Sequence, residues 1–571
     1  MPAGIDQTPN RVRVIRGGTM IDGTGRAPVP NGVLLIEGDT ISQISADGSA
    51  SVPPGAEVIN ASGKHILPGL IDGHVHFHGW MVEPLLHYGI TSVLDLGNLE
   101  DWILAYKEGT EKGRIYGPRI FAVGPLLNGI PNEGPGSIEG SNVGVKDPEF
   151  ARAEIRRLAA KGVDGIKFYW NTPMNVLRAA NQEAHGHGLR VAIHISSADA
   201  NELADAGVDG LAHGCGIGLA TVKDPIKRKR YREQTFPPMP DGVFPHYVWA
   251  GDPSNEPHYL MEEENFDEVI RNLISKNVFI NPTLVFAWNC AHGRWNDFER
   301  DILDFNRDPR LGYIPEENKA LWLEHGSGAC DQMTGEEKRL MVEGYRKYQT
   351  FLRQFVQAGG KIMNGSDPVH SGVPGLGLHQ EMELLSDVGL NPMQVIQATT
   401  KNVAEYMNKQ ESLGTLEEGK LADILIVDAD PLADIRNLRK VHLLLKGGET
   451  LDTEYHSDYK NPFPRPENNI VIFREVPILV PVLSSISPSK VLEGTKGLTV
   501  TVKGKYFLRT SIVRANGINL PTEFVNVMEL RARVPDEITA QPGVYSFTVT
   551  SPHLGSSDPN LNNTLLLVTF K

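Results

Sequence analysis

Residues 69–78, GLIDGHVHFH, begin as an apolar strand and end in three histidines. Residues two apart in a strand point to the same face, so His74 and His76 can converge on one point. Two imidazoles that converge in this way can chelate a metal ion. A histidine-rich loop would give the same letters, and an isolated H-x-H is weak evidence. The fold and the site therefore depend on whether other strands supply matching residues.

Single ionisable residues stand at the ends of other apolar segments. His194 follows RVAI, His213 follows DGLA, Asp367 follows KIMNGS, and Lys167 lies in GVDGIKF. The region contains eight predicted apolar strands in all, and they alternate with segments that have apolar residues at helical spacing. Because parallel strands need crossover helices, eight strand-helix units predict a (β/α)8 barrel with insertions. In such a barrel, residues at the C-terminal ends of the strands carry the chemistry.

Short β segments flank this region on both sides. Residues 11–66 and the segment after Gly414 contain strands separated by Gly, Asp and Pro, and we expect the two pieces to pair. The end of the chain alternates strands and turns at about ten-residue spacing, which predicts a second sandwich. The predicted fold class is α/β, a (β/α)8 TIM barrel inserted in a small β-sandwich and followed by an all-β immunoglobulin-like sandwich. The expected domains are 1–66 and 413–455 for the split sandwich, 67–412 for the barrel, 456–480 for a linker, and 481–571 for the C-terminal domain.

Composition limits the partners. The chain has 571 residues and a net charge of −15, which argues against nucleic acid or an anionic membrane as the main partner. It contains no apolar stretch of about twenty residues and no signal-peptide core at its start. We expect a soluble protein, cytoplasmic or, if a signal peptide was removed, periplasmic or secreted. A homo-oligomer is compatible with these features.

Three cysteines, Cys215, Cys290 and Cys330, are too few for a disulfide framework and show no C-x-x-C spacing. Cys290 and Cys330 could pair in an oxidising compartment, but two buried thiols are the simpler expectation.

Two excursions interrupt the strand-helix alternation, at about residues 221–257 and 289–335. Long loops in compact domains are usually functional or disordered, so both are candidates for a lid over the barrel mouth. The first contains the basic run KDPIKRKRYR, and such a run is usually a solvated face.

Lys167 is the most informative of the strand-end residues. A protonated ammonium has no lone pair to offer a metal and would repel it. If the amine instead reacts with carbon dioxide, the resulting carbamate has two oxygens that can bridge two metals. The alternative is a lysine paired with a carboxylate at the barrel mouth.

The segments GLIDGHVH, IKFY, VAIHI, LAHG, NGSDP and LGTLEEGKLADILIVDADP together resemble the amidohydrolase superfamily, close to its imidazolonepropionase and prolidase-like members. The resemblance spans about residues 12–450. It implies that His74, His76 and Asp367 bind one metal, that His194 and His213 bind a second, and that carbamylated Lys167 bridges them. Mixed nitrogen and oxygen ligands of this kind favour zinc, with manganese, cobalt and iron as alternatives.

The same resemblance implies a metal-dependent hydrolase acting on a C–N bond, of EC 3.4 or 3.5 type. A hydroxide bridged between two metals would attack the carbonyl, and Asp367 would carry the proton to the leaving amine. The expected substrate is a dipeptide or an N-acyl amino acid. The alternatives are a cyclic amide hydrolase or deaminase, and a non-catalytic binding protein. The weaker candidates for substrate contact are Arg228, Tyr231, His292 and His370, with His78 as a further histidine beside the motif.

The segment SSISPSKVLEGTKGLTVTVKGKYF resembles the opening of an IPT/TIG immunoglobulin-like module, over roughly the last ninety residues. Such modules bind partners or pack on neighbouring domains. The resemblance implies an unidentified partner and assigns no chemistry to this end of the chain.

Overall fold

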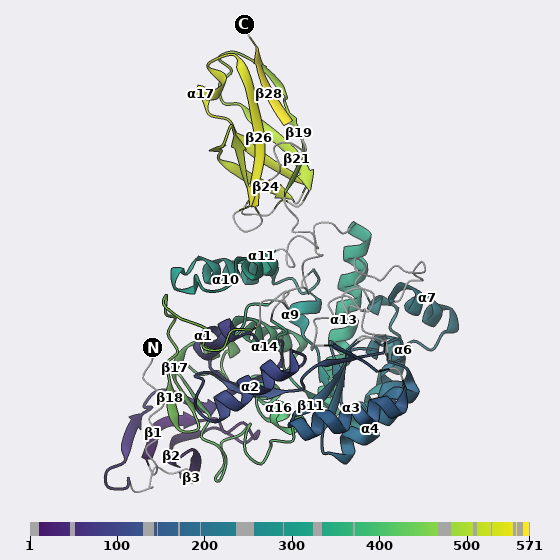
Figure 1. The fold of residues 1–571 in the computed structure, drawn as a ribbon, viewed down its shortest axis with the longest axis vertical. Coiled ribbons are helices and arrows are strands. Elements are labelled where there is room, and N and C mark those ends of the chain that lie inside the picture. The colour runs from purple at the N-terminus through teal and green to yellow at the C-terminus, as the bar shows by residue number, and fades with distance from the viewer. Residues whose placement is uncertain are drawn as a thin grey trace. The chain divides into compact units, whose positions relative to one another are not determined.

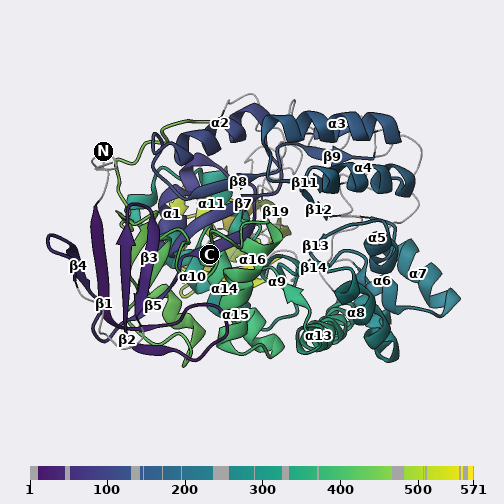
Figure 2. The same cartoon turned by 90° about the horizontal axis from the view of Figure 1, so that it is seen from below.

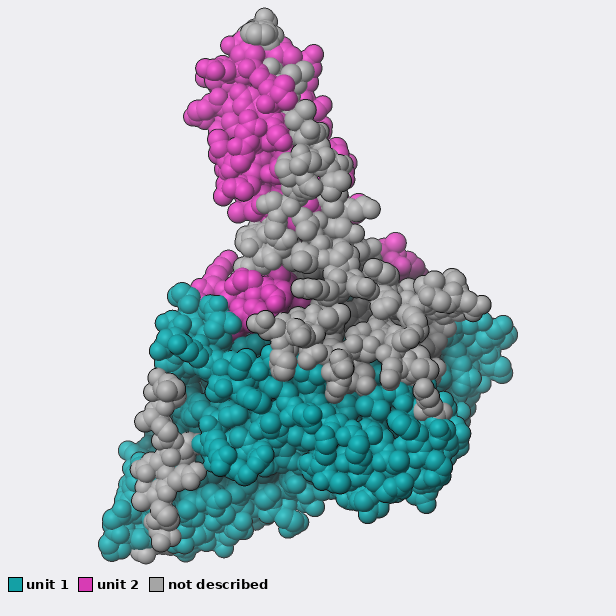
Figure 3. All heavy atoms as spheres, viewed as in Figure 1, with its two compact units in different colours: residues 1–292, 309–313, 340–472 teal, residues 293–308, 314–339, 473–571 magenta. Residues whose placement is uncertain are grey.

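The computed structural model describes residues 11–45, 52–129, 142–145, 147–169, 172–194, 196–235, 256–288, 290–323, 334–368, 372–465, 481–505, 507, 511–526, 528–551, 555–556 and 564–569. The chain forms two compact units (Figure 3). Unit 1 contains residues 1–292, 309–313 and 340–472, and unit 2 contains residues 293–308, 314–339 and 473–571.

Strands from both flanking pieces of unit 1 form one sheet of eight strands. Its order is β18-β17-β16-β5-β1-β2-β3, with β4 paired to β1. The antiparallel pairing of β5 with β16 aligns Leu67 with Leu425, which confirms that the two pieces pair. Ile15, Leu34 and Ile424 are fully buried in its core. The strands are β1 (Val12–Met20), β2 (Val29–Glu37), β3 (Thr40–Ser45), β4 (Glu57–Asn60), β5 (His65–Pro68), β16 (Ile424–Val427), β17 (Val441–Lys446) and β18 (Glu449–Leu451).

The eight strands predicted for the barrel are all present, and they lie in two parallel sheets. One sheet has the order β6-β7-β8 and the other β10-β9-β11-β12-β13-β14-β15. The first contains β6 (Leu70–Val75), β7 (Ile90–Asp95) and β8 (Arg119–Ala122). The second contains β9 (Leu126–Asn128), β10 (Asn142–Gly144), β11 (Gly165–Phe168), β12 (Arg190–Ile193), β13 (Gly210–Ala212), β14 (Phe279–Asn281) and β15 (Lys361–Ile362).

The first parallel sheet is linked to the second at both of its edges. At one edge, β8 is followed directly in the chain by β9, which lies between β10 and β11 in the second sheet. At the other edge, Gly73 N donates to Asn364 O at 2.9 Å and Asp367 N donates to His74 O at 2.8 Å. A Cβ on Gly73 would lie 2.6 Å from Asn364 O, and one on Gly365 would lie 2.5 Å from His74 N. The backbones approach this closely because both positions are glycine.

Helices surround the parallel strands, and Figure 2 shows α3 to α8 around the outside of β11 to β14. Local signals set their ends. Helix α3 begins after Asp147, whose side chain accepts from two backbone N–H groups, and ends at Gly162 with φ 83°. Figure 1 labels many of these helices. They are α1 (Val82–His87), α2 (Glu100–Glu111), α3 (Pro148–Lys161), α4 (Met174–Gly186), α5 (Ala200–Asp205), α6 (Ile217–Thr221), α7 (Pro225–Thr235), α8 (Phe266–Ser275), α9 (Leu284–Ala287), α13 (Gly335–Gln357), α14 (Leu376–Val388), α15 (Pro392–Thr399) and α16 (Lys401–Tyr406).

Unit 2 contains helices α10 (Trp295–Arg307) and α11 (Glu316–Leu323) and an all-β region near the end of the chain. This region has two sheets, ordered β19-β21-β25-β24 and β20-β28-β26-β22-β23, with β27 paired to β26. Val500, Leu530 and Phe547 belong to their shared buried core. The elements are β19 (Val482–Ser487), β20 (Lys490–Leu492), β21 (Thr499–Lys505), β22 (Ile512–Ala515), β23 (Ile518–Asn519), β24 (Thr522–Asn526), β25 (Glu529–Arg533), α17 (Asp536–Thr539), β26 (Gly543–Ser551), β27 (Gly555–Ser556) and β28 (Thr564–Thr569).

The cysteines differ from the simpler expectation. Cys215 is free and buried, but Cys290 is bonded in a disulfide, so a free thiol at that position was the wrong expectation. Sequence spacing could not decide this, because a disulfide depends on how closely two distant segments approach. Cys330 lies outside the described residues.

In the described part of the chain, no helix combines the length and the apolar character needed to cross a membrane.

Candidate metal centre

The six predicted ligands lie at or just beyond the C-terminal ends of five parallel strands. His74 is in β6 and His76 follows it. Lys167 is in β11, and Asp367 follows β15 by a short segment. The remaining two, His194 and His213, directly follow β12 and β13.

Three imidazoles surround the carboxylate of Asp367. His74 Nε2 lies 3.8 Å and His213 Nε2 lies 3.6 Å from Asp367 Oδ2, and His76 Nε2 lies 3.7 Å from Oδ1. His74, His76 and Asp367 offer atoms that all lie within 4.8 Å of one another. Ligand atoms around a tetrahedral zinc ion, each about 2.0–2.1 Å from it, are roughly 3.3 Å apart. The observed spacings are therefore close to those that a divalent ion requires.

The imidazole of His194 lies against that of His213. The ring centroids of His194 and His213 are 4.1 Å apart, and those of His74 and His213 are 5.0 Å apart. The structure therefore brings all four predicted histidines into one contiguous group.

Hydrogen bonds to the other ring nitrogen hold three of these imidazoles with Nε2 towards Asp367. His74 Nδ1 lies 2.6 Å from Asn281 Oδ1, and His76 Nδ1 lies 2.9 Å from Gly97 O. Both oxygens can only accept, so each Nδ1 carries the proton and each Nε2 keeps its lone pair. His213 Nδ1 lies 2.5 Å from Thr283 Oγ1. Such supporting bonds orient histidine ligands in metal sites.

The sequence reasoning missed these supporting residues. Asn281 and Thr283 stand in VFINPTLV, an otherwise apolar segment. Polar residues at the end of an apolar strand could have indicated a role at the site. A buried Asn or Thr, however, more often only makes hydrogen bonds to the nearby backbone.

Several buried polar atoms of the group have no hydrogen-bond partner among the described residues. They are Lys167 Nζ, His194 Nε2 and Asp367 Oδ1. A buried unpaired polar atom costs about 1–3 kcal/mol, so native structures seldom tolerate three together without a reason. One or two bound cations would satisfy the nitrogen of His194 and the oxygen of Asp367, so these residues fit a metal site.

Burial also changes the protonation of the group. Burial, together with the charge of Lys167, lowers the pKa of His74 and of His194 well below the ordinary value, so both imidazoles are neutral at pH 7. Burial lowers the pKa of Lys167 to about 8 and raises the pKa of Asp367. At neutral pH about a tenth of the Lys167 amine is then unprotonated.

Asp72 links the two segments that contain His74 and Asp367. Its Oδ1 accepts from His74 N at 3.2 Å and from Ser366 N at 3.0 Å, and its Oδ2 accepts from Ser366 Oγ at 2.5 Å. The carboxylate is fully buried, and this burial raises its pKa to about 7. One side chain therefore fixes the position of His74 relative to the neighbouring Asp367.

Three residues of the group have left-handed backbone. His213 has φ 56°, Asp367 has φ 48° and Thr283 has φ 42°. This region is unfavourable for residues with a Cβ, most of all for a β-branched threonine. Such strain costs on the order of 1–3 kcal/mol per residue and concentrates at functional sites.

The weaker candidates for substrate contact have other partners or positions. In α7, Arg228 pairs with Asp199 and also donates to Leu219 O, and Tyr231 OH donates to Glu256 Oε2 at 2.6 Å. Other cations of the basic run also face carboxylates, since Lys227 lies 2.9 Å from Glu262. His292 is half-buried beyond α9. His370 and residues 236–255 of the first excursion lie outside the described residues.

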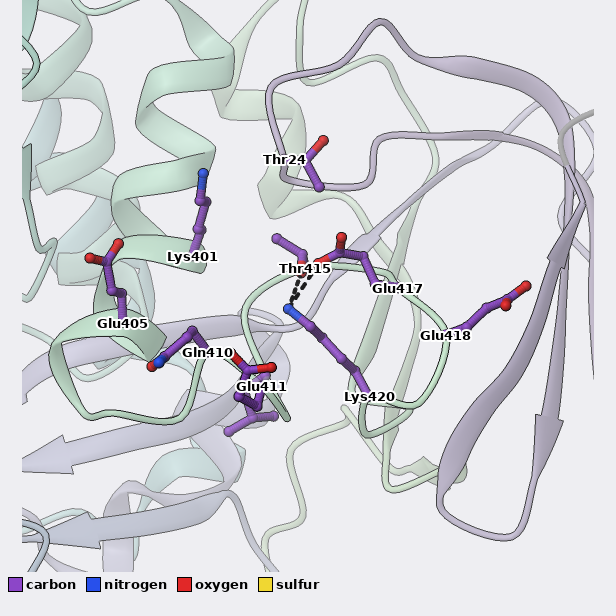
Figure 4. Close-up of a pocket in the computed structure, with 10 residues that line it drawn as sticks. Thr24, Lys401, Glu405, Gln410, Glu411, Thr415, Glu417, Glu418 and Lys420 are labelled. Atoms are coloured by element: carbon purple, nitrogen blue, oxygen red, sulfur yellow. Dashed lines mark hydrogen bonds and ion pairs between the residues drawn. The ribbon is translucent and has the colours of Figure 1, made fainter.

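A cavity of about 530 Å³ lies elsewhere in unit 1, and none of the predicted ligands lines it. Its lining comes mainly from α16 and the loop after it (Figure 4). Within it, Lys420 donates to Thr415 Oγ1 at 2.6 Å and pairs with Glu417 at 2.9 Å. The cavity offers no imidazole, and its charges neutralise one another in part.

Parts of the chain are similar in sequence to known proteins. Residues 310–451 match the profile of the Amidohydrolase family. An adenine deaminase of Paracoccus denitrificans is 35% identical over 71 residues, 12% of each chain. An N-acyl-D-aspartate deacylase of Alcaligenes xylosoxydans xylosoxydans is 37% identical over 86 residues, 14% of this chain and 16% of the relative. The matched segments therefore span only a small part of these relatives' lengths.

Solved structures resemble a larger part of the chain. A Xaa-Pro dipeptidase with bound methionine covers 77% of this chain and is itself covered completely, with a TM-score of 0.53 and 19% identity. Phenylurea hydrolase B covers 80% and is also covered completely, with a TM-score of 0.55 and 19% identity. At this identity the likeness concerns the fold alone.

Proposed function

We propose that the chain is a metal-dependent hydrolase that cleaves a C–N amide bond in a dipeptide or an N-acyl amino acid. The convergence of His74, His76 and His213 on Asp367 carries this proposal, since their spacing suits a divalent ion. We also take the two parallel sheets as arcs of one (β/α)8 barrel, in which these strand ends form the catalytic face.

The proposed centre holds two ions, for which zinc is the favoured identity. His74, His76 and Asp367 would hold one ion, and His194 with His213 would hold the other. Lys167 would bridge them as a carbamate. Its buried, unpaired Nζ and lowered pKa support this role, because only an unprotonated amine reacts with carbon dioxide.

Divalent ions held at this point would lower the pKa of an attacking water and polarise the substrate carbonyl. Asp367 would accept the proton of that water, and its buried Oδ1, which makes no hydrogen bond among the described residues, supports this role. Asp367 would then donate this proton to the leaving amine nitrogen as the C–N bond breaks.

The named relatives favour a substrate with an amide bond. The N-acyl-D-aspartate deacylase and the Xaa-Pro dipeptidase are named for acyl amino acid and dipeptide substrates. The likeness to an adenine deaminase favours deamination as a second candidate. Lys167 argues against that candidate, because deaminases of the superfamily usually hold one metal and lack a bridging lysine.

Metal analysis and a substrate screen test the proposal together. Purified protein loaded with zinc should hold about two ions per chain and release amino acids from dipeptides or N-acyl amino acids. One ion with release of ammonia from adenine would favour the deaminase. No bound ion after loading would contradict the metal centre itself.

For the C-terminal all-β region we propose an IPT/TIG-like module that binds a partner or packs on neighbouring domains. Its two sheets and common core agree with that architecture. The disulfide at Cys290 favours an oxidising compartment, so we propose a periplasmic or secreted location over a cytoplasmic one.

A further inference from the structure

Residues 452–465, which we call the arm, leave β18 and run along the loop that follows the H-x-H motif. Tyr459 OH donates to Gly79 O at 2.6 Å, and a Cβ on Gly79 would lie 2.1 Å from Asn461 Oδ1. The sequence predicted a linker from residue 456, but this part of it is packed on unit 1. Because residue 79 is a glycine and has no side chain, the arm can lie directly against the backbone at this position.

An aromatic anchor holds the next part of the arm. Phe463 stacks on Trp102 with ring centroids 6.3 Å apart and an interplanar angle of 7°, and Trp102 Nε1 donates to Phe463 O at 3.2 Å. Tyr106 lies 6.1 Å from the same ring. The backbone is therefore fixed two residues before Arg465, which limits where that side chain can reach.

Arg465 brings a cation beside the metal-binding motif. Its Nη1 lies 3.5 Å from Nε2 of His78, the third histidine of that motif. Its Nε is buried and makes no hydrogen bond among the described residues. A guanidinium has five N–H donors and keeps its charge at neutral pH. Among the described residues, this one long contact engages a single donor of Arg465.

The carboxylate of Asp95, which lies near Arg465, already accepts hydrogen bonds from other residues. The charge of Asp95 favours the protonated guanidinium, but burial outweighs it and lowers the pKa of Arg465. Asp95 Oδ2 accepts from Phe77 N at 2.7 Å and from Asn98 Nδ2 at 2.8 Å, and its Oδ1 accepts from Gly97 N at 3.1 Å. The described residues form no ion pair with Arg465, so its charge is available to pair with an external anion.

We propose that Arg465 binds the free carboxylate of the substrate, with His78 beside it, and so sets the specificity of the metal centre for acids. A planar guanidinium binds a carboxylate through two parallel hydrogen bonds. This inference rests on the proposed function. It assigns the cationic role to the arm, because Lys227 and Arg228 of the basic run in α7 already face carboxylates. Recognition would then depend on a segment outside the parallel strands.

The test compares an acid with its amide. Acetate release from N-acetyl-L-methionine and from N-acetyl-L-methioninamide is measured for zinc-loaded wild type, Arg465→Gln, Arg465→Lys and Lys460→Gln. Lys460 is an exposed cation on the same arm and serves as the matched control. We expect Arg465→Gln to lose about 10- to 100-fold in kcat/KM for the acid, mainly through KM, and to leave the amide unchanged. Arg465→Lys should recover part of the loss, and Lys460→Gln should match wild type.

Other outcomes contradict the inference. Equal losses for acid and amide, or loss of bound zinc, would mean that Arg465 only supports the structure. No change in either substrate would remove it from recognition. If wild type hydrolyses neither compound, the proposed function fails for this substrate class, and titration calorimetry of metal-free protein with N-acetyl-L-methionine then decides. Weaker binding in Arg465→Gln than in wild type supports the inference, and equal or absent binding overturns it.

Discussion

Replacing Thr283 by valine isolates one hydroxyl group beneath the candidate metal centre. Thr283 is fully buried, has φ 42°, and its Oγ1 lies 2.5 Å from His213 Nδ1. Valine has the same branching at Cβ, so the backbone strain is similar in both proteins and the comparison measures the hydroxyl. A hydrogen-bond partner behind a metal-binding histidine typically contributes 10–100-fold in metal affinity, or about 1.4–2.7 kcal/mol.

The assay titrates metal-free protein with zinc in competition with a chromophoric chelator at neutral pH. We expect Thr283→Val to weaken binding of the ion assigned to His213 and to leave the ion assigned to His74 and His76 nearly unchanged. Thr283→Ser keeps the hydroxyl and should behave like wild type. Wild-type affinity for both ions in Thr283→Val would refute the reasoning, because the orientation of His213 would then not depend on this bond.

Two further changes test the charges of the site, and a third tests Glu381, a buried carboxyl group in α14. Lys167→Ala should lose bound metal and turnover, with partial rescue of both by a short carboxylic acid in solution, and full activity without rescue would exclude a bridging carbamate. Asp367→Asn keeps an oxygen ligand but removes the base, so kcat should fall by about a hundredfold or more while metal remains bound; turnover near wild type would exclude the proton-transfer role. Burial raises the pKa of Glu381 from 4.5 to about 8, and its Oε2 accepts from Val285 N at 2.6 Å. The contribution of Glu381 to folding stability is fully present below the pKa that Glu381 has in the unfolded chain. It is lost as pH rises through the folded-state pKa of about 8. Glu381→Gln keeps the hydrogen-bond acceptor but cannot ionise. The free energy of unfolding of wild type should fall by on the order of 4 kcal/mol between about pH 5 and pH 9, and this fall should be absent in Glu381→Gln. Equal pH dependence of urea unfolding in both proteins would show that Glu381 is ionised at little cost.

The strands and the positions of the predicted ligands followed from local patterns. Each apolar segment ends in a polar residue such as His194 or His213, and the C-terminal ends of parallel strands meet on one face. The rule that residues two apart share a face placed His74 and His76 together without knowledge of the other strands. These features depend on short-range periodicity, which a single sequence contains.

The supporting contacts did not follow, because they join segments distant in sequence. Asn281 meets His74 across 207 positions, and Arg465 meets His78 across 387. Residue 465 stands in a polar, proline-rich stretch whose composition predicts a linker, and nothing local distinguishes a packed arm from a solvated one. Left-handed backbone at Asp367 also has no local signal, since tertiary contacts impose it against the residue's own preference.

The pairing of β5 with β16 sets an order for synthesis on the ribosome. Leu67 aligns with Leu425, which is made 358 positions later. At 5–20 residues per second this interval lasts roughly 20 to 70 seconds. During that time β5 can pair with β1 on one side only, and its other edge stays open to pairing with other chains. A chain that stops before β16 would therefore expose an apolar strand edge to aggregation instead of forming a smaller folded protein.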